Sequence, residues 1–237
     1  MERTAIVTGA SSGIGLALVS ELIDRGWNVA AVSRDTDKLA KATEKLGPNV
    51  RVCPADISDR KSVDAMMSKV TEEFGGLDLL VANAGLFSNV DFVDVEPATI
   101  ESVIGVNLIG AMHCAQAAIP LMKRQKSGDI HFIGSIAGVT SLPNEAVYSP
   151  AKFGLRSFAH ILRRQLRNDG IRVALISPGT VATPLWGEWD PDDVASKVDA
   201  GEILTAEDIA AASLFILDQP RHVAIRDLVI LPSNQDV

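Results

Sequence analysis

The segment Thr8-Gly9-Ala10-Ser11-Ser12-Gly13-Ile14-Gly15 follows a short apolar run and precedes an amphipathic stretch. Its glycines let the backbone turn tightly and approach a pyrophosphate, and a helix that begins here supplies free N–H groups and a positive dipole end. An ordinary Gly/Ser turn has a similar composition, but the place between a strand and a helix is what dinucleotide binding requires. The residues expected to bind the cofactor in this segment are Gly9, Ser11, Ser12, Gly13, Ile14 and Gly15.

Short apolar or β-branched runs recur beyond this segment, and none shows the two-residue alternation of a half-exposed strand. Near-continuous apolar character is typical of strands buried on both faces of a parallel sheet. The predicted strands are 3–8, 28–33, 50–53, 78–81, 129–134, 171–176 and 227–231, and the predicted helices between them are 13–25, 37–46, 59–74, 97–123, 148–168 and 206–218. This alternation predicts an α/β fold with a doubly wound, mostly parallel, Rossmann-like sheet of about seven strands.

The composition limits the classes of function. No repeat or linker interrupts the 237 residues, which predicts a single domain over 1–237. A formal net charge of −8 argues against nucleic acid as a partner. No apolar run approaches about 18 residues and the N-terminus lacks the apolar block of a signal peptide, so we expect no membrane span. Two cysteines without a CxxC pair suit the cytoplasm, and the spacing of the histidines predicts no metal site.

The glycine spacing is G-x-x-x-G-x-G, which differs from the commoner G-x-G-x-x-G fingerprint. TGASSGIG resembles the glycine motif of the short-chain dehydrogenase/reductase family, and the resemblance extends along nearly the whole chain. The other matching motifs are Pro54-Ala55-Asp56-Ile57, Asn83-Ala84-Gly85, Asn107, Ser135, Tyr148-Ser149-Pro150-Ala151-Lys152, and Pro178-Gly179 with Val181 and Thr183.

This resemblance implies an oxidoreductase that moves a hydride between a nicotinamide cofactor and a carbonyl/alcohol pair. It also implies further cofactor contacts from Asp56, Ile57, Asn83, Ala84, Gly85, Tyr148, Lys152, Pro178, Gly179, Val181 and Thr183.

Tyr148 and Lys152 lie four residues apart at the start of a predicted helix, so they share one face. A free phenol has a pKa of about 10, and a neighbouring ammonium is expected to lower that pKa. The family resemblance implies that Tyr148 is the general acid/base and that Lys152 also holds the nicotinamide ribose. It further implies that Ser135 binds the substrate oxygen and that Asn107 positions a water in the proton path. Tyr148 is the only tyrosine in the chain.

The second predicted strand ends at Ser33-Arg34, where NAD-preferring enzymes usually offer a carboxylate to the ribose hydroxyls. A guanidinium instead suits a 2′-phosphate. Asp35 could reach the ribose after a one-residue shift, but its position also suits a helix cap. The sequence therefore favours NADP(H), with NAD(H) as the weaker alternative, bound in part by Ser33 and Arg34.

The resemblance places a substrate loop at about 184–204. Besides Ser135 and Tyr148, we expect Leu185 and Trp186 to contact the substrate, with Trp189 in the same lid and Phe87, Val139 and Leu142 as further wall residues. Pro184, Gly187, Pro191 and several acids predict little regular structure before Asp192, so we expect a mobile lid that orders over bound ligands.

Other features leave alternatives open. The ending Ala224–Pro232 resembles the branch of the family that acts on short 3-hydroxy acids, and the helical faces of 97–123 and 148–168 predict a homodimer or homotetramer. An NADP(H)-sensing regulator without catalysis would usually lose the tyrosine or the lysine. An epimerase or dehydratase on the same scaffold usually has a longer substrate region.

Overall fold

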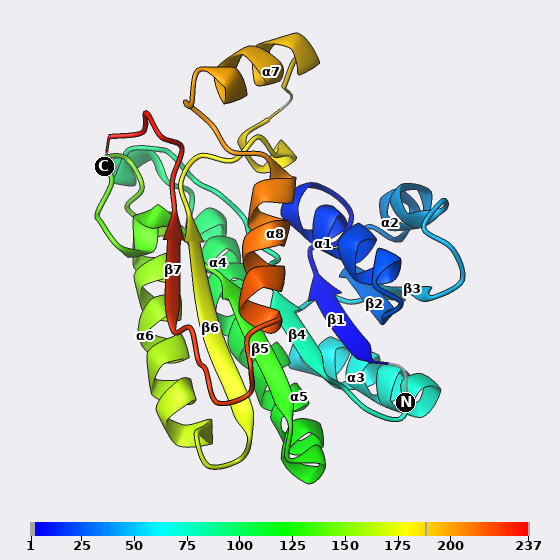
Figure 1. Cartoon of the computed structure of the whole chain (residues 1–237). Coiled ribbons are helices and arrows are strands. Elements are labelled where there is room, and N and C mark those ends of the chain that lie inside the picture. The colour runs from blue at the N-terminus through cyan, green and yellow to red at the C-terminus, as the bar shows by residue number, and fades with distance from the viewer. Residues whose placement is uncertain (1–2, 188, 237) are drawn as a thin grey trace.

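The computed structural model describes residues 3–187 and 189–236, which alternate between strands and helices (Figure 1). The strands are β1 (Thr4–Thr8), β2 (Asn28–Ser33), β3 (Val50–Pro54), β4 (Leu79–Ala82), β5 (Gly128–Ile133), β6 (Ile171–Pro178) and β7 (Asp227–Ile230). The helices are α1 (Gly13–Asp24), α2 (Thr36–Thr43), α3 (Arg60–Phe74), α4 (Pro97–Ile104), α5 (Ala111–Gln125), α6 (Tyr148–Leu166), α7 (Pro191–Asp199) and α8 (Ala206–Leu217). Short helical turns are η1 (Phe92–Asp94), η2 (Gly105–Gly110), η3 (Ile136–Gly138) and η4 (Pro184–Trp186).

The strands form one sheet in the order β3-β2-β1-β4-β5-β6-β7, and every pair is parallel. Ile6 of β1 lies opposite Ala30 of β2 on one side and Leu80 of β4 on the other. The strand order therefore reverses at the β1/β4 pair, where chain segments leave in opposite directions. The carboxyl ends of strands at such a switch point form the crevice in which doubly wound proteins bind ligands. The predicted fold is confirmed.

Helices cover both faces of the sheet (Figure 1). One face packs against α3, α5 and α6 around side chains such as Phe132 and Met122, and the other packs against α1 and α8 around Leu18 and Ile209. These side chains are fully buried, which explains why the strands lack alternation in the sequence. The two apolar layers fix the sheet rigidly beneath the loops at its carboxyl edge.

The helical stretch Pro97–Gln125 joins α4, η2 and α5, and η2 is a π-helical segment. This stretch is long and apolar enough by composition to cross a membrane. However, Val106, Cys114, Ala118 and Met122 pack in the core beneath the sheet. The stretch is therefore a core helix of the domain, and its one turn of wider π geometry is a feature often found at functional sites.

The sequence predicts little regular structure before Asp192, and between Thr183 and Pro191 the described residues form only the short turn η4. Helix α7, at Pro191–Asp199, was not predicted. Asp190 caps the helix by accepting hydrogen bonds from the N–H groups of Asp192 and Asp193, and Pro191 stands in the first turn, where it is tolerated. The proline and acids that predict irregular structure are thus the N-terminal signals of a helix. Figure 1 shows α7 standing beyond the carboxyl edge of the sheet, apart from the helical layers.

Candidate functional site

A cleft of about 890 Å³ opens at the carboxyl edge of the sheet, over the β1/β4 switch point. It gathers residues from the ends of β1, β2, β3, β4, β5 and β6 and from the beginning of α6. The predicted residues that line it are Gly9, Ser11, Ser12, Gly13, Ile14, Ser33, Arg34, Asp56, Ile57, Asn83, Ala84, Gly85, Ser135, Tyr148, Lys152, Pro178, Gly179, Val181, Thr183, Leu185 and Trp186. Gly15 and Asn107 are predicted residues that do not line the cleft. The structure thus brings nearly the whole predicted set together, while their individual contacts stay predictions.

Gly9 and Gly15 shape the turn between β1 and α1. Gly9 has a φ of +67°, which disfavours any other residue, and a Cβ at Gly15 would lie 2.3 Å from the carbonyl oxygen of Gly9. Gly15 therefore allows the backbone of the turn to pack closely against itself, which is consistent with its absence from the lining of the cleft.

Asn83 holds this turn from the end of β4. Its Nδ2 donates hydrogen bonds to the carbonyl oxygens of Thr8, at 2.9 Å, and Gly9, at 3.3 Å. The Thr8 hydroxyl in turn accepts from the backbone N–H groups of Asn83, at 3.0 Å, and Ala84, at 3.1 Å. The side chain of Asn83 therefore fixes the glycine turn, and its amide is already engaged before any cofactor binds.

Helix α1 points its N-terminus into the cleft through Ser12, Gly13 and Ile14. The side chain of Ser12 makes no capping hydrogen bond, and the first turn contains no acidic residue. The positive end of the helix dipole is thus not compensated by a carboxylate of this turn. Such an end is suited to a phosphate group, which satisfies the free N–H groups and the dipole together.

Two cations line the cleft beyond the end of β2. Arg34 is exposed, and Lys38 projects from α2. Asp35 is the N-cap of α2, because its Oδ1 accepts a hydrogen bond from the N–H of Lys38 at 2.9 Å. The carboxylate is therefore engaged as the helix cap that its position suggested. Lys38 was not among the predicted cofactor residues, although its position in the first turn after Arg34 is visible in the sequence.

Asp56 lies at the same end of the cleft, after β3. Its Oδ1 accepts hydrogen bonds from the N–H of Ser58 at 2.9 Å and from the Ser58 hydroxyl at 2.6 Å. These bonds, chiefly the one from the hydroxyl, lower the pKa of the Asp56 carboxyl, and the charge of Arg34 acts in the same direction. The group is therefore a carboxylate with a fixed orientation.

Ser135, Tyr148 and Lys152 meet at the centre of the cleft. Ser135 follows β5 and caps η3, its Oγ accepting from the N–H of Ala137 at 3.1 Å. Tyr148 and Lys152 begin α6 on one face, and both are nearly fully buried. Lys152 Nζ donates to the carbonyl oxygen of Ile133 at 3.0 Å and lies 5.5 Å from the centroid of the Tyr148 ring. The predicted spacing thus produces a contiguous hydroxyl–phenol–amine group.

The pKa values of this group are set chiefly by burial. Desolvation raises the pKa of Tyr148 above its ordinary value, a hydrogen bond with Ser135 opposes the rise, and the Glu145 carboxylate adds to it. Desolvation lowers the pKa of the Lys152 amine to about 8. In the free protein the pKa of Tyr148 is thus shifted upward, opposite to the lowering expected from the Lys152 ammonium, and burial is the main cause.

Asn107 lies in the π-helical segment η2, and its Oδ1 would lie 2.7 Å from a Cβ placed on Gly85 of the cleft wall. Its Nδ2 donates to the carbonyl oxygens of Leu86 at 2.7 Å and Val103 at 2.9 Å. Its Oδ1 is buried and has no partner among the described residues. A buried acceptor of this kind is commonly satisfied by an ordered water. The geometry therefore suits a water-binding role, although Asn107 itself is not in the wall of the cleft.

Aromatic side chains wall the cleft beside Tyr148. The Phe87 ring meets the Tyr148 ring edge-on with centroids 5.0 Å apart, and the Trp186 ring lies 4.3 Å from Phe87 on its other side. Leu185 and Trp186 are 38% and 41% exposed. Val139 and Leu142, which were predicted as wall residues, do not line the cleft. Leu142 packs instead against the cluster that contains Tyr148 and Val147.

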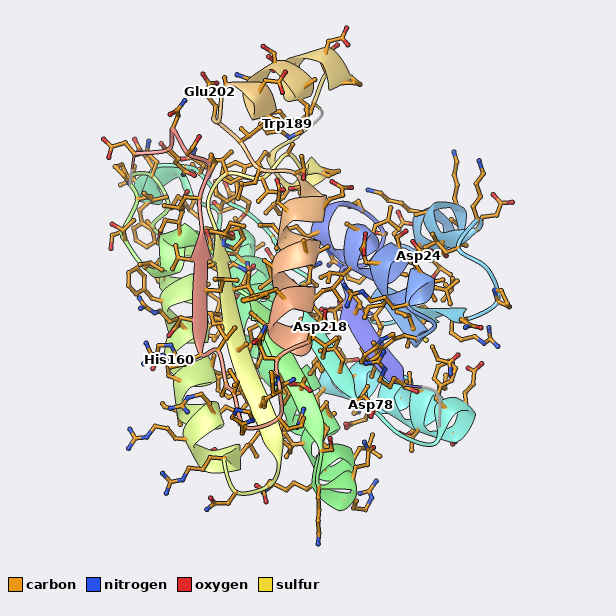
Figure 2. All side chains as sticks on the ribbon, viewed as in Figure 1. Asp24, Asp78, His160, Trp189, Glu202 and Asp218 are labelled. Atoms are coloured by element: carbon orange, nitrogen blue, oxygen red, sulfur yellow. The ribbon has the colours of Figure 1, made fainter. Side chains whose placement is uncertain are left out.

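The segment that carries α7 is fixed at its two ends, which Figure 2 marks by Trp189 and Glu202. Trp189 Nε1 donates to the carbonyl oxygen of Thr183 at 3.0 Å. The N–H of Asn234 donates to the carbonyl oxygen of Gly201 at 2.8 Å, and Gln235 Oε1 accepts from the N–H of Thr180 at 2.9 Å. The segment is thus tied at one end to Thr183 of the cleft wall and at the other end to Asn234 near the C-terminus.

Comparisons with known proteins agree with this arrangement. The family model described as short chain dehydrogenase matches residues 3–194. An uncharacterized oxidoreductase of Staphylococcus aureus (strain N315) is 34% identical over 232 residues, covering 98% of this chain and 97% of its own length. A similar relative from Staphylococcus saprophyticus is 33% identical over 235 residues, with coverage of 98% and 97%.

Solved structures extend the similarity to three dimensions. The closed form of a serine dehydrogenase complexed with NADP+ has a TM-score of 0.90 at 29% identity, covering 99% of this chain and 96% of its own. An alcohol dehydrogenase from the archaeon Thermococcus sibiricus, complexed with 5-hydroxy-NADP, has a TM-score of 0.88 at 27% identity, with coverage of 100% and 99%.

Proposed function

Since the chain belongs to the short-chain dehydrogenase family and is an oxidoreductase, we propose that it interconverts a carbonyl compound and an alcohol with NADP(H), using Tyr148 as general acid/base. The observation that carries the proposal is the buried group of Ser135, Tyr148 and Lys152 in the wall of the cleft. The same cleft holds the uncapped N-terminus of α1, so one cavity offers both a phosphate site and a proton donor.

The residues present fit a phosphorylated dinucleotide. The N-terminus of α1 suits the pyrophosphate, and Arg34 and Lys38 suit a 2′-phosphate, because both are cations beyond the end of β2. The Asp35 carboxylate could otherwise bind the ribose hydroxyls of NAD(H), but its Oδ1 is engaged in capping α2. The two solved structures complexed with NADP+ and an NADP derivative support the same assignment. When bound, the nicotinamide supplies or accepts the hydride.

The protein residues handle the proton. A Tyr148 phenol whose pKa is raised by burial stays protonated, which suits donation to the oxygen of a carbonyl substrate. The Ser135 hydroxyl, fixed by η3, would hydrogen-bond that oxygen and stabilise negative charge that develops on it. Lys152 has a pKa of about 8, so its amine can both give and take a proton near neutral pH. A water bound to Asn107 Oδ1 would pass protons to Lys152 and Tyr148.

Three finer assignments belong to the same proposal. The 184–204 segment is the substrate loop, since Leu185 and Trp186 line the cleft. The enzyme is cytoplasmic, as its two free cysteines suggest. It forms homodimers or homotetramers through the outer faces of η2 and α6, where Ile109 and Phe153 are exposed at 43% and 37%.

The direct test is to incubate the purified protein with NADPH and a panel of ketones, aldehydes and 3-oxo acids. We expect NADPH to be consumed with at least one carbonyl compound and the corresponding alcohol to form. A protein that binds NADPH but reduces nothing in the panel would speak for the sensing alternative. Mass photometry of the same sample measures the oligomeric state.

A further inference from the structure

The cations of the cleft are distributed unevenly. Among the described residues that line it, the basic side chains are Arg34, Lys38 and Lys152. The first two lie beyond β2, and Tyr148 lies beyond β5, with β1 and β4 between these strands. Three strand spacings correspond to about 14 Å. Arg34 and Lys38 are therefore too far away to bind a substituent of the substrate that reacts at Tyr148.

Lys152 does not supply a carboxylate site either. Its Nζ is buried, donates to the carbonyl oxygen of Ile133, and has a pKa lowered to about 8 by burial. The amine thus lies beneath Tyr148 as part of the reacting group. The described wall on the substrate side of Tyr148, formed by Leu86, Phe87, Leu185 and Trp186, contains no positive charge.

A negative group acts on the reacting hydroxyl instead. Glu145, three residues before Tyr148, is buried and accepts a hydrogen bond from the Ser149 hydroxyl at 3.2 Å. Its carboxylate raises the pKa of Tyr148, which shows that its field reaches the phenol. Glu145 does not itself line the cleft, but its charge would disfavour an anionic substrate at Tyr148, and no cation of the described wall would compensate. The apolar wall would also not replace the hydration that an anion loses on binding.

The wall offers flat apolar surfaces in place of charge. Phe87 is held between Tyr148 and Trp186, with ring centroids 5.0 Å and 4.3 Å away. Trp186 and Leu185 stay partly exposed on the cleft side of η4. Stacked and edge-to-face contacts with rings are favourable beyond simple area burial. The pocket therefore favours a planar, apolar substituent next to the reacting carbon.

We propose that the substrate is an uncharged ketone or aldehyde, or the matching alcohol, that carries an aromatic ring, and that the enzyme discriminates against carboxylates, the short 3-hydroxy acids included. This inference rests on the proposed oxidoreduction and gives it a substrate class. It departs from the resemblance of the C-terminal segment to the hydroxy-acid branch.

Two matched pairs of substrates test the proposal with NADPH. Methyl benzoylformate and benzoylformate share one skeleton and differ in charge, and we expect the ester to have at least tenfold higher kcat/KM. Acetophenone and cyclohexyl methyl ketone have similar shapes and differ in the ring, and we expect acetophenone to have a lower KM. Equal or better use of benzoylformate, or a preference for the saturated ketone, overturns the proposal and leaves the oxidoreductase assignment intact. No turnover of any of the four compounds, with NADPH still bound, counts against both.

Variants distinguish the effect of the pocket on kcat/KM from the effect of the ester's intrinsic reactivity. Leu185→Arg places a cation in the wall, so we expect the ester-to-acid ratio of kcat/KM to fall at least fivefold. Phe87→Leu and Trp186→Leu each remove one ring, and we expect the KM for acetophenone to rise about threefold to tenfold with a smaller change for the saturated ketone. Phe92→Leu is the matched control, because Phe92 is 62% exposed and lies outside the cleft. Ratios that stay unchanged in Leu185→Arg and in both ring variants would place the substrate elsewhere.

Discussion

Lys152 and Tyr148 form a buried pair in which the amine lies 5.5 Å from the centroid of the phenol ring and is hydrogen-bonded to the carbonyl oxygen of Ile133. Burial disfavours the charged form of each group, so the phenol keeps its proton and the amine loses its own more easily. Near neutral pH the pair is thus a protonated phenol beside an amine that can give or take a proton, as the proposed proton transfer requires.

Replacing Tyr148 by Phe removes the hydroxyl and keeps the ring that packs against Phe87. We expect NADPH to bind almost as in the wild type, while carbonyl reduction falls by about 10²–10⁴-fold, the usual contribution of a general acid. Fluorescence titration with NADPH and single-turnover kinetics measure the two effects. More than a tenth of the wild-type chemical rate in the variant would disprove the assignment.

Lys152 should make the stability of the free protein depend on pH. Its pKa falls from 10.5 in the unfolded chain to about 8 in the fold, so the unfolded chain binds more protons between these values. The contribution of this group to the free energy of unfolding therefore rises with pH from about 8 to 10.5. Below pH 8 the full cost of burying the charged amine remains. The difference of 2.5 pKa units corresponds to about 3 kcal/mol.

We accordingly expect Lys152→Met to be more stable than the wild type at pH 7, by up to about 3 kcal/mol, and to lose this advantage toward pH 10.5. Urea unfolding of both proteins across this range measures it. Cys114 acts in the opposite direction, because burial raises its pKa to about 12, but its effect is common to both proteins and cancels in the difference. Parallel stability curves would refute the prediction.

Arg34→Asp exchanges a cation for a carboxylate that can accept hydrogen bonds from ribose hydroxyls. We expect preference to shift from NADPH toward NADH by about 2 to 4 kcal/mol, because one charge-assisted contact is lost and a repulsion is added. Ratios of kcat/KM for the two cofactors measure the shift. Lys41→Asp is the control: it changes the net charge of the protein equally, but Lys41, in α2, does not line the cleft. Equal use of both cofactors by the wild type would already contradict the idea.

The 184–204 segment should order when the cleft is filled. Leu185 and Trp186 are partly exposed, and α7 has no fully buried residue. The amides of 184–187 and 189–199 are therefore expected to exchange quickly in the free protein and at least tenfold more slowly with NADP+ and a substrate analogue. Hydrogen exchange with mass spectrometry makes the comparison, with the buried strand β5 as the internal reference. Strong protection in both states would indicate a fixed loop.

Gly15→Ala tests how tightly the phosphate-binding turn is packed. The new Cβ would lie 2.3 Å from the carbonyl oxygen of Gly9, so we expect a loss of about 2 kcal/mol or more of stability together with weaker NADPH binding. Gly105→Ala is the matched control, since its Cβ would meet only Ser58, at 3.7 Å, and should cost little. Thermal unfolding and NADPH titration distinguish the two. Similar behaviour of both variants would mean that the turn yields easily.

The order of elements was predictable because strands buried on both faces have continuous apolar runs, as in β1 and β6. The cleft residues were predictable because their motifs stand at the ends of strands. Helix α7 was missed because Asp190 and Pro191 read as breakers, and only their placement before Asp193 makes them a cap. The raised pKa of Tyr148 was not predictable from the spacing to Lys152, since it depends on how completely the fold removes water from both groups.

The hydrogen bonds between Thr8 and Asn83 join positions 75 residues apart in the chain. During refolding, the glycine turn after β1 cannot take its final shape until β4 has docked beside β1, and loop closure over such a distance is slow. The ability to bind the cofactor should therefore return late, after most helices have formed. The rate at which NADPH binding recovers would then measure the long-range step of folding, separately from the early gain of helical circular dichroism.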